Sequence, residues 1–105
     1  MKVTFEGLDP AVRKLQALPF PSSPDDDDLA DIVSGLSGLT AEMLRAADRA
    51  GRGEPVWPDQ VPETAALIRR LSEIQTVGED DVAIYGQAVA YLEALDQIRR
   101  LLLGQ

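Results

Sequence analysis

Cysteine and histidine are both absent from this 105-residue chain. Their absence excludes disulfides, thiolate and imidazole metal ligands, and every catalytic arrangement that pairs a nucleophile with an imidazole. Self-contained zinc and haem sites, and the two-histidine di-iron sites of helical bundles, are excluded for the same reason. We therefore expect a protein that is not an enzyme and that holds no metal or cofactor.

Aromatic residues and lysines are scarce as well. The chain has two phenylalanines, one tryptophan, two tyrosines and only two lysines, Lys2 and Lys14. Leucine, isoleucine, valine and phenylalanine still make up 29 of the 105 residues, which is enough to exclude intrinsic disorder as the default. The core must therefore be built mainly from aliphatic side chains, as is typical of packed helices.

The net charge of −8 arises from 18 acidic and 10 basic residues. Such an acidic chain is poorly suited to contact phosphate backbones, so we expect no nucleic-acid partner. An acidic surface more often serves solubility and less often attracts a basic protein. No apolar run approaches the ~20 residues that cross a bilayer, and residues 1–7 lack the apolar core of a signal peptide. We expect no membrane contact and a cytoplasmic location.

Helix start and stop signals divide the chain into four helical segments. Proline at a first helical position opens three of them, at Pro10, Pro24 and Pro62, and Gly78 separates the last two. The predicted fold class is all-α, with one domain over residues 1–105 that forms a small bundle of three main helices. The apolar spacing places these helices at 24–50, 62–77 and 80–103, adds a short N-terminal helix at 10–18, and leaves an alternation at 2–6 that is compatible with a strand.

Gly35 and Gly38 interrupt the longest predicted helix. Each glycine costs about 1 kcal/mol relative to alanine in a helix interior, and Thr40 offers a cap for a separate second helix. The apolar positions nevertheless keep steps of three and four residues across both glycines. We favour one helix over 24–50 and keep two helices as the alternative.

The aspartates at 25–28 and Asp31 form the one cluster in the sequence that could bind a metal ion or take part in a reaction. Residues 27–31 match the spelling DDxxD, with which isoprenoid synthases hold magnesium against a diphosphate, and Asp27 and Asp31 share a helix face. Such synthases also need a long helical barrel and a second acidic motif, and the chain has neither. We interpret these aspartates, and the pair Asp80–Asp81, as groups that satisfy free N–H groups and the dipole at helix starts.

Trp57 lies in a loop bounded by prolines. A tryptophan there can fold back as a lid over the open end of the bundle, which is the interpretation we favour. It can also project as an anchor for a partner, since tryptophan is enriched at interface hot spots. Trp57 is therefore kept as a candidate interface residue.

The C-terminal helix carries the clearest sign of association. If residues 62–77 and 80–103 form an antiparallel hairpin, the second arm is longer by roughly 12 Å at ~1.5 Å per residue. The apolar seam that runs into this surplus consists of Leu95, Ile98, Leu101 and Leu102. Either another segment of the same chain covers the seam or a second copy does, and we give the two equal weight.

The sequence thus predicts a non-enzymatic protein–protein interaction or assembly module that forms a homodimer through its C-terminal helix. The candidate interface residues are Trp57, Leu95, Ile98, Leu101 and Leu102. The alternative is an acidic, antitoxin-like inhibitor that occupies a basic, nucleic-acid-binding groove of a target protein. An exposed apolar patch would favour the module, and carboxylates spaced like phosphates along one face would favour the inhibitor.

Overall fold

Four α-helices and two short 3-10 helices make up the protein over residues 7–104, which is the part that the computed structural model describes. Residues 7–104 are 72% helical, which confirms the all-α class, and no strand occurs among them. The strand expected at 2–6 lies outside the described residues. In chain order the elements are α1 (Leu8–Ala17), α2 (Asp27–Gly51), η1 (Pro58–Gln60), α3 (Ala65–Glu73), η2 (Glu79–Asp81) and α4 (Val82–Leu102).

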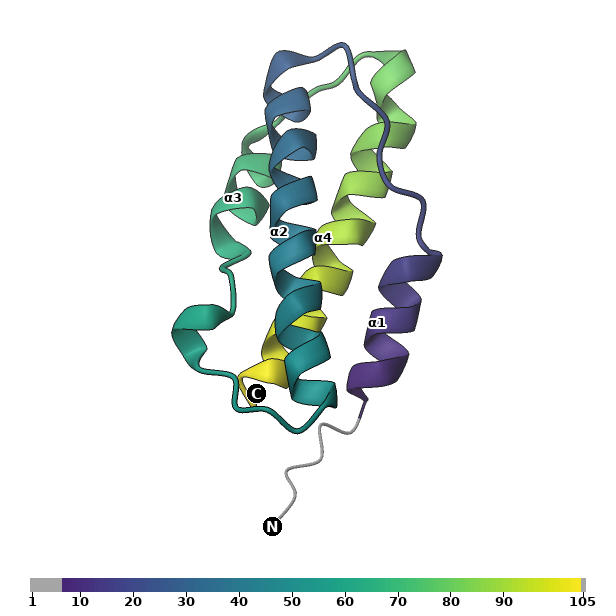
Figure 1. The fold of residues 1–105 in the computed structure, drawn as a ribbon. Coiled ribbons are helices and arrows are strands. Elements are labelled where there is room, and N and C mark those ends of the chain that lie inside the picture. The colour runs from purple at the N-terminus through teal and green to yellow at the C-terminus, as the bar shows by residue number, and fades with distance from the viewer. Residues whose placement is uncertain (1–6, 105) are drawn as a thin grey trace.

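The helices form an up-and-down bundle whose centre is the contact between α2 and α4 (Figure 1). The helix α4 also packs against α1 and α3, and α2 packs against the same two helices. In Figure 1, α1 and α3 lie on opposite sides of α2, and α1 runs beside the C-terminal half of α4. The long helices are therefore flanked by two short ones, one on each side.

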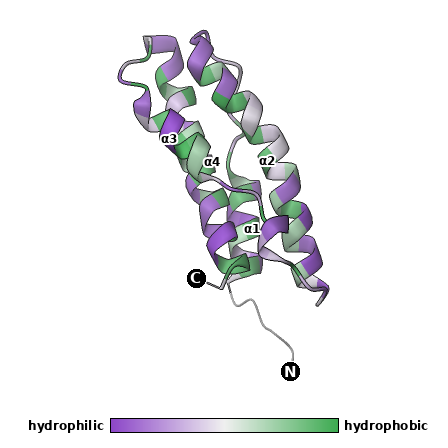
Figure 2. Ribbon diagram, turned by 90° about the vertical axis from the view of Figure 1, so that its left-hand side faces the viewer, coloured by the Kyte–Doolittle hydropathy of each residue, from purple (hydrophilic) through white to green (hydrophobic). Residues whose placement is uncertain are grey.

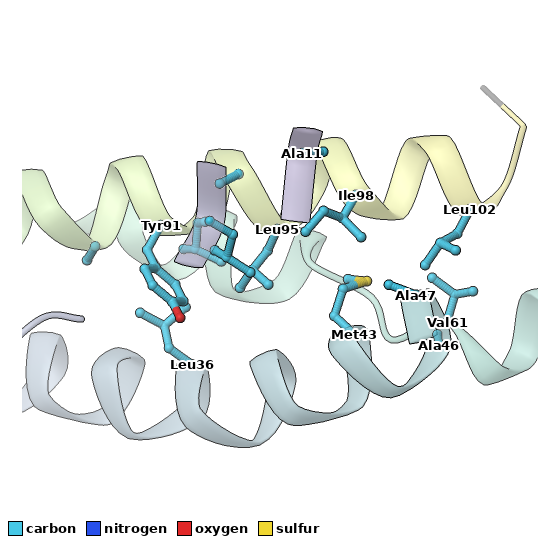
Figure 3. Packing of buried hydrophobic residues seen from close by; sticks show 14 of the residues in the cluster. Ala11, Leu36, Met43, Ala46, Ala47, Val61, Tyr91, Leu95, Ile98 and Leu102 are labelled. Carbon is cyan, nitrogen blue, oxygen red and sulfur yellow. The ribbon is translucent and has the colours of Figure 1, made fainter. Parts of the chain in front are cut away.

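The core is mainly aliphatic, as the scarcity of aromatic residues predicts. Leu36 of α2 faces Tyr91 of α4, Met43 of α2 faces Leu95 and Ile98 of α4, and all of these side chains are buried (Figure 3). Hydrophobic and hydrophilic positions alternate along each helix, as expected of amphipathic helices that pack on one side (Figure 2). Each such buried side chain contributes about 1.5–3 kcal/mol.

The helix α2 runs without interruption through Gly35 and Gly38, so the single-helix interpretation is confirmed. A Cβ atom placed on Gly35 would lie 3.3 Å from Cδ2 of Leu67 in α3, which is a tight contact. A Cβ atom on Gly38 would meet no atom within 4 Å. Gly35 therefore permits the close approach of α3 to α2, whereas Gly38 has no packing role.

The predicted start of this helix at Pro24 is wrong. The helix begins at Asp27, and Pro24 is a buried residue of the connector before it. Asp26 is the N-cap, because its side chain accepts a 2.9 Å hydrogen bond from the backbone N–H of Leu29. A capping carboxylate satisfies one of the free N–H groups of the first turn, so the helix starts directly after Asp26.

The third helix is shorter than the predicted 62–77, since α3 covers only Ala65–Glu73. Ile74 has extended dihedral angles (φ −74°, ψ 112°) and ends the helix. Ile74 and Val77 still pack against the core, but from a non-helical segment. The spacing of Ile74 and Val77 shows that both are buried, but it does not show that both are helical. The prediction from apolar spacing therefore extended the helix too far. The other two helices differ from 10–18 and 80–103 by one or two residues at their ends.

Candidate functional site

The aspartates at the start of α2 have structural partners. Asp81, in the turn that leads into α4, is only 4% exposed, and its carboxylate accepts hydrogen bonds from the backbone N–H groups of Asp25 (3.0 Å) and Asp26 (2.9 Å). The side chain of Asp31 forms a 3.6 Å ion pair with Arg70 of α3. No group of three or more acidic residues within the described part of the chain has the geometry of a metal site. The acidic cluster therefore connects the start of α2 to α3 and α4.

This connection corrects one detail of the sequence interpretation. Asp81 was expected to cap its own helix, but it makes no capping bond there and instead holds the entry to α2. The two segments are separated by 55 residues in the sequence, so local rules cannot reveal the pairing.

The leucine-rich seam of α4 is buried within the chain. Leu95 and Ile98 are 0% exposed, Leu102 is 6% exposed and Leu101 is half-buried. The helix α1 covers the seam: a Cβ atom on Gly7, the residue before α1, would lie 3.9 Å from Cδ2 of Leu101. Of the two alternatives that the sequence leaves open, the structure shows cover by other segments of the same chain, because α1 and α2, and not the hairpin partner α3, pack on the C-terminal half of α4 (Figures 1 and 3).

Among residues 7–104, Trp57 is the most exposed of the large hydrophobic residues, with 61% of its surface accessible. It therefore does not cover the end of the bundle as a lid would. Its backbone is nevertheless fixed by the 3-10 turn that follows. The N–H of Trp57 donates to Oε1 of Gln60 at 3.0 Å, and the N–H of Gln60 donates to the carbonyl of Trp57 at 2.9 Å. The indole is thus presented to solvent from an ordered turn.

The main candidate site is an open pocket between α3 and α4, with a volume of about 220 Å³. We call it the α3–α4 pocket. Leu71 and Leu92 are buried at its base, and Ile68 at its edge is 40% exposed. The lining residues are Ile68, Leu71 and Ser72 of α3 and Tyr85, Val89, Leu92, Glu93 and Asp96 of α4.

Hydrogen bonds already engage most polar groups of the α3–α4 pocket. The hydroxyl of Tyr85 donates to the carbonyl of Leu71 at 3.2 Å, and the hydroxyl of Ser72 donates to the carbonyl of Arg69 at 2.7 Å. The first bond attaches α4 to the backbone of α3, and the second lies within α3. Neither hydroxyl is placed beside a base that would activate it.

The two carboxylates of the pocket differ in their partners. Asp96 is mostly buried: Oδ1 accepts a 2.7 Å hydrogen bond from the hydroxyl of buried Thr64, and Oδ2 lies 2.9 Å from Nε of Arg100. Glu93 is exposed, and it forms no ion pair within residues 7–104. The pocket thus combines an apolar base with one carboxylate free to accept a cation.

The other cavities are less distinctive. A larger open groove of about 350 Å³ between α1 and α2 includes Asp9, Asp48 and Arg52, but Arg52 is already paired with Asp48 (3.3 Å) and Glu54 (2.9 Å). A third hollow of about 130 Å³ lies on the segment between α3 and α4. The groove has a more polar lining than the α3–α4 pocket, and the third hollow is smaller.

The α3–α4 pocket could not be found from the sequence. The spacing of Ile68 is that of a residue on the buried face of the predicted helix 62–77, yet its side chain is 40% exposed. No local signal reveals the pocket, because it depends on the short length of α3, which the sequence did not predict.

Comparison of the chain with protein-family models, with curated proteins and with solved structures found no match. Among the described residues, none of the helices combines the length and the apolar character that crossing a membrane requires.

Proposed function

We propose that this chain is a non-enzymatic protein-interaction module of the cytoplasm, and that it receives a partner at the α3–α4 pocket. The observation that carries the proposal is the pocket itself, where apolar side chains reach the surface beside a free carboxylate. Exposed apolar surface rimmed by polar groups is typical of interaction sites. An enzyme site would require an acid, base or nucleophile held free for reaction, and here Glu93 alone is unengaged.

The dimensions of the pocket favour a protein partner over a small molecule. Sites for drug-sized ligands usually enclose about 300–1,000 Å³ and bury most of the ligand. The α3–α4 pocket has about 220 Å³ and is open to solvent. Such a hollow suits one or two side chains of a partner whose remaining contacts lie on the surrounding surface.

Self-association through the C-terminal helix has less support than a different partner. The seam that suggests it consists of Leu95, Ile98 and Leu102, and these side chains pack within the same chain. A homodimer would therefore need another surface, and the exposed indole of Trp57 is the candidate that remains.

Site-specific photo-crosslinking in the native host tests the proposal. A photoreactive amino acid replaces Ile68 at the edge of the pocket, and in a control it replaces the exposed Arg13 of α1, which lines none of the cavities. We expect a discrete covalent partner from position 68 and none from position 13. Equal capture from both positions, or none from either, would contradict docking at the pocket. Capture only from positions in 25–31 would favour the acidic inhibitor instead.

A further inference from the structure

We infer that the partner segment is a basic amphipathic helix, with an aliphatic side chain in the α3–α4 pocket and a lysine or arginine against Glu93. This inference rests on the proposed function and adds the chemistry of the partner. It follows from the shape of the pocket, from the arrangement of its charges and from the backbone groups that the surface offers.

The pocket follows one stripe of α4. Its lining residues on this helix begin at Tyr85, continue at Val89 one turn later and at Glu93 after a further turn, and end at Asp96. At 1.5 Å per residue these eleven steps span about 16 Å, or three helical turns. The opposite wall, from Ile68 to Ser72, spans about one turn of α3. A partner helix of three to four turns laid along α4 matches this length.

The backbone of the site favours a helix over an extended peptide. An extended peptide gains affinity by pairing its N–H and C=O groups with a free sheet edge. The walls of the pocket are two α-helices whose backbone groups bond internally, so they offer no such edge. A partner helix satisfies its own backbone groups and needs only side-chain contacts, as in other helix-in-groove complexes.

The acidic residues of the stripe are confined to one of its two ends. Tyr85 and Val89 form its apolar end, and Glu93 and Asp96 form its acidic end. Every charged residue that lines the pocket is acidic, and the whole chain carries −8. Asp96 is engaged by Thr64 and Arg100, so Glu93 is the carboxylate available to a partner.

A cation on the partner therefore belongs one or two turns from the aliphatic side chain that enters the pocket. The net charge of the chain would also attract a basic partner to the protein. A second copy of the chain is a poor occupant, because it would bring the same excess of carboxylates to the interface.

The test uses the full chain and three synthetic helical peptides of four turns. The first carries a leucine followed, four and seven positions later, by lysines. The second has glutamates in place of the lysines, and the third has alanine in place of the leucine. Binding is followed by amide chemical shifts in a two-dimensional NMR titration of the labelled protein. We expect the first peptide to bind at least about fivefold more tightly than either of the others, with shifts centred on Ile68, Val89 and Glu93.

Charge reversal gives the matched comparison. In Glu93→Lys the preference for lysine over glutamate should disappear or invert. In Glu42→Lys, an exposed position of α2 outside the pocket with the same change in net charge, the preference should persist within about twofold. Retained amide spectra confirm that both variants are folded.

The outcomes separate the two proposals. If leucine peptides of either charge bind the pocket equally, the basic partner is wrong while docking at the pocket stands. If the lysine peptide binds at residues 25–31, or if none of the peptides binds the pocket, the inference is overturned. In the latter case, a partner still captured from position 68 would preserve the proposed function. The inference holds if leucine and lysine are both required and Glu93→Lys alone removes the preference.

Discussion

Asp81 offers the sharpest test of how this bundle is held together. Its carboxylate is 4% exposed and accepts two backbone hydrogen bonds, from Asp25 at 3.0 Å and from Asp26 at 2.9 Å. Replacing Asp81 with alanine leaves both N–H groups without their acceptor at a partly buried position. A hydrogen bond to a charged group contributes about 1.5–3 kcal/mol when it is well shielded, so two partly shielded bonds should contribute about 2–4 kcal/mol.

One opposing effect reduces this loss. The aspartates at 25–28 and the acidic turn at 79–81 repel one another, and each neighbouring carboxylate contributes on the order of 0.5 kcal/mol of repulsion in water at low salt. Removing the charge of Asp81 relieves part of that repulsion. The net destabilisation of Asp81→Ala should therefore be about 1.5–3 kcal/mol, which is a large share of the 5–15 kcal/mol typical of a domain.

Urea denaturation followed by circular dichroism measures this change. Asp81→Asn keeps one acceptor oxygen but turns an amide N–H toward the second donor. Its loss in the free energy of unfolding should therefore be about half that of Asp81→Ala. Asp80→Asn is the control, because Asp80 is exposed and its replacement removes the same charge. It should change the free energy of unfolding by about 0.5 kcal/mol or less. Added salt should widen the gap between wild type and Asp81→Asn, since screening weakens the repulsion that the variant relieves. A loss below about 0.5 kcal/mol in Asp81→Ala, or equal losses at 80 and 81, would refute this account.

Two further substitutions test the packing. Gly38→Ala should stabilise the protein by about 0.5–1 kcal/mol in thermal or urea denaturation, because the added Cβ meets nothing within 4 Å. Gly35→Ala should gain less or lose, since its Cβ would lie 3.3 Å from Leu67, and equal gains at both positions would show that this contact is unimportant. Ile98→Ala should cost about 2–5 kcal/mol because the side chain is fully buried. Ile98→Glu should unfold the chain and not merely dissociate a dimer, so a folded, monomeric Ile98→Glu variant would restore the seam as an interface.

The existence and order of the helices could be predicted because their signals are local. Apolar steps of three and four residues and helix-breaking prolines and glycines act within a few residues of one another. The residues at which the helices begin and end were harder to predict, as the start of α2 illustrates. Pro24 and the aspartates that follow it both indicate a helix start within a few residues, and the hydrogen bond that the N–H of Leu29 donates to Asp26 decides between them. Only the tertiary position of the connector shows which carboxylate is free to cap.

The site could not be predicted because burial on a helix depends on which neighbours cover it. The C-terminal seam extends beyond its hairpin partner, and the sequence leaves open whether another segment of the same chain or a second copy covers Ile98 and Leu102. In the structure α2 and α1, both distant in sequence, pack on this half of α4. The reverse situation occurs at Ile68, which has the spacing of a core residue but is 40% exposed. Periodicity identifies an apolar face and does not say which segment packs against it.

The origin of the α3–α4 pocket lies in the way α3 is held. Its N-terminal turn places Leu67 on Gly35, and one turn later Arg70 pairs with Asp31, so two successive contacts attach α3 to α2. Consecutive residues of a helix point about 100° apart. With Leu67 directed at α2, Ile68 is directed along the edge between α3 and α4, where no segment within residues 7–104 completes the cover. The same contacts that make α3 a stable part of the bundle therefore leave apolar surface of α4 open. The exposure of Ile68 is a consequence of the packing, and filling that edge is the task we assign to the partner.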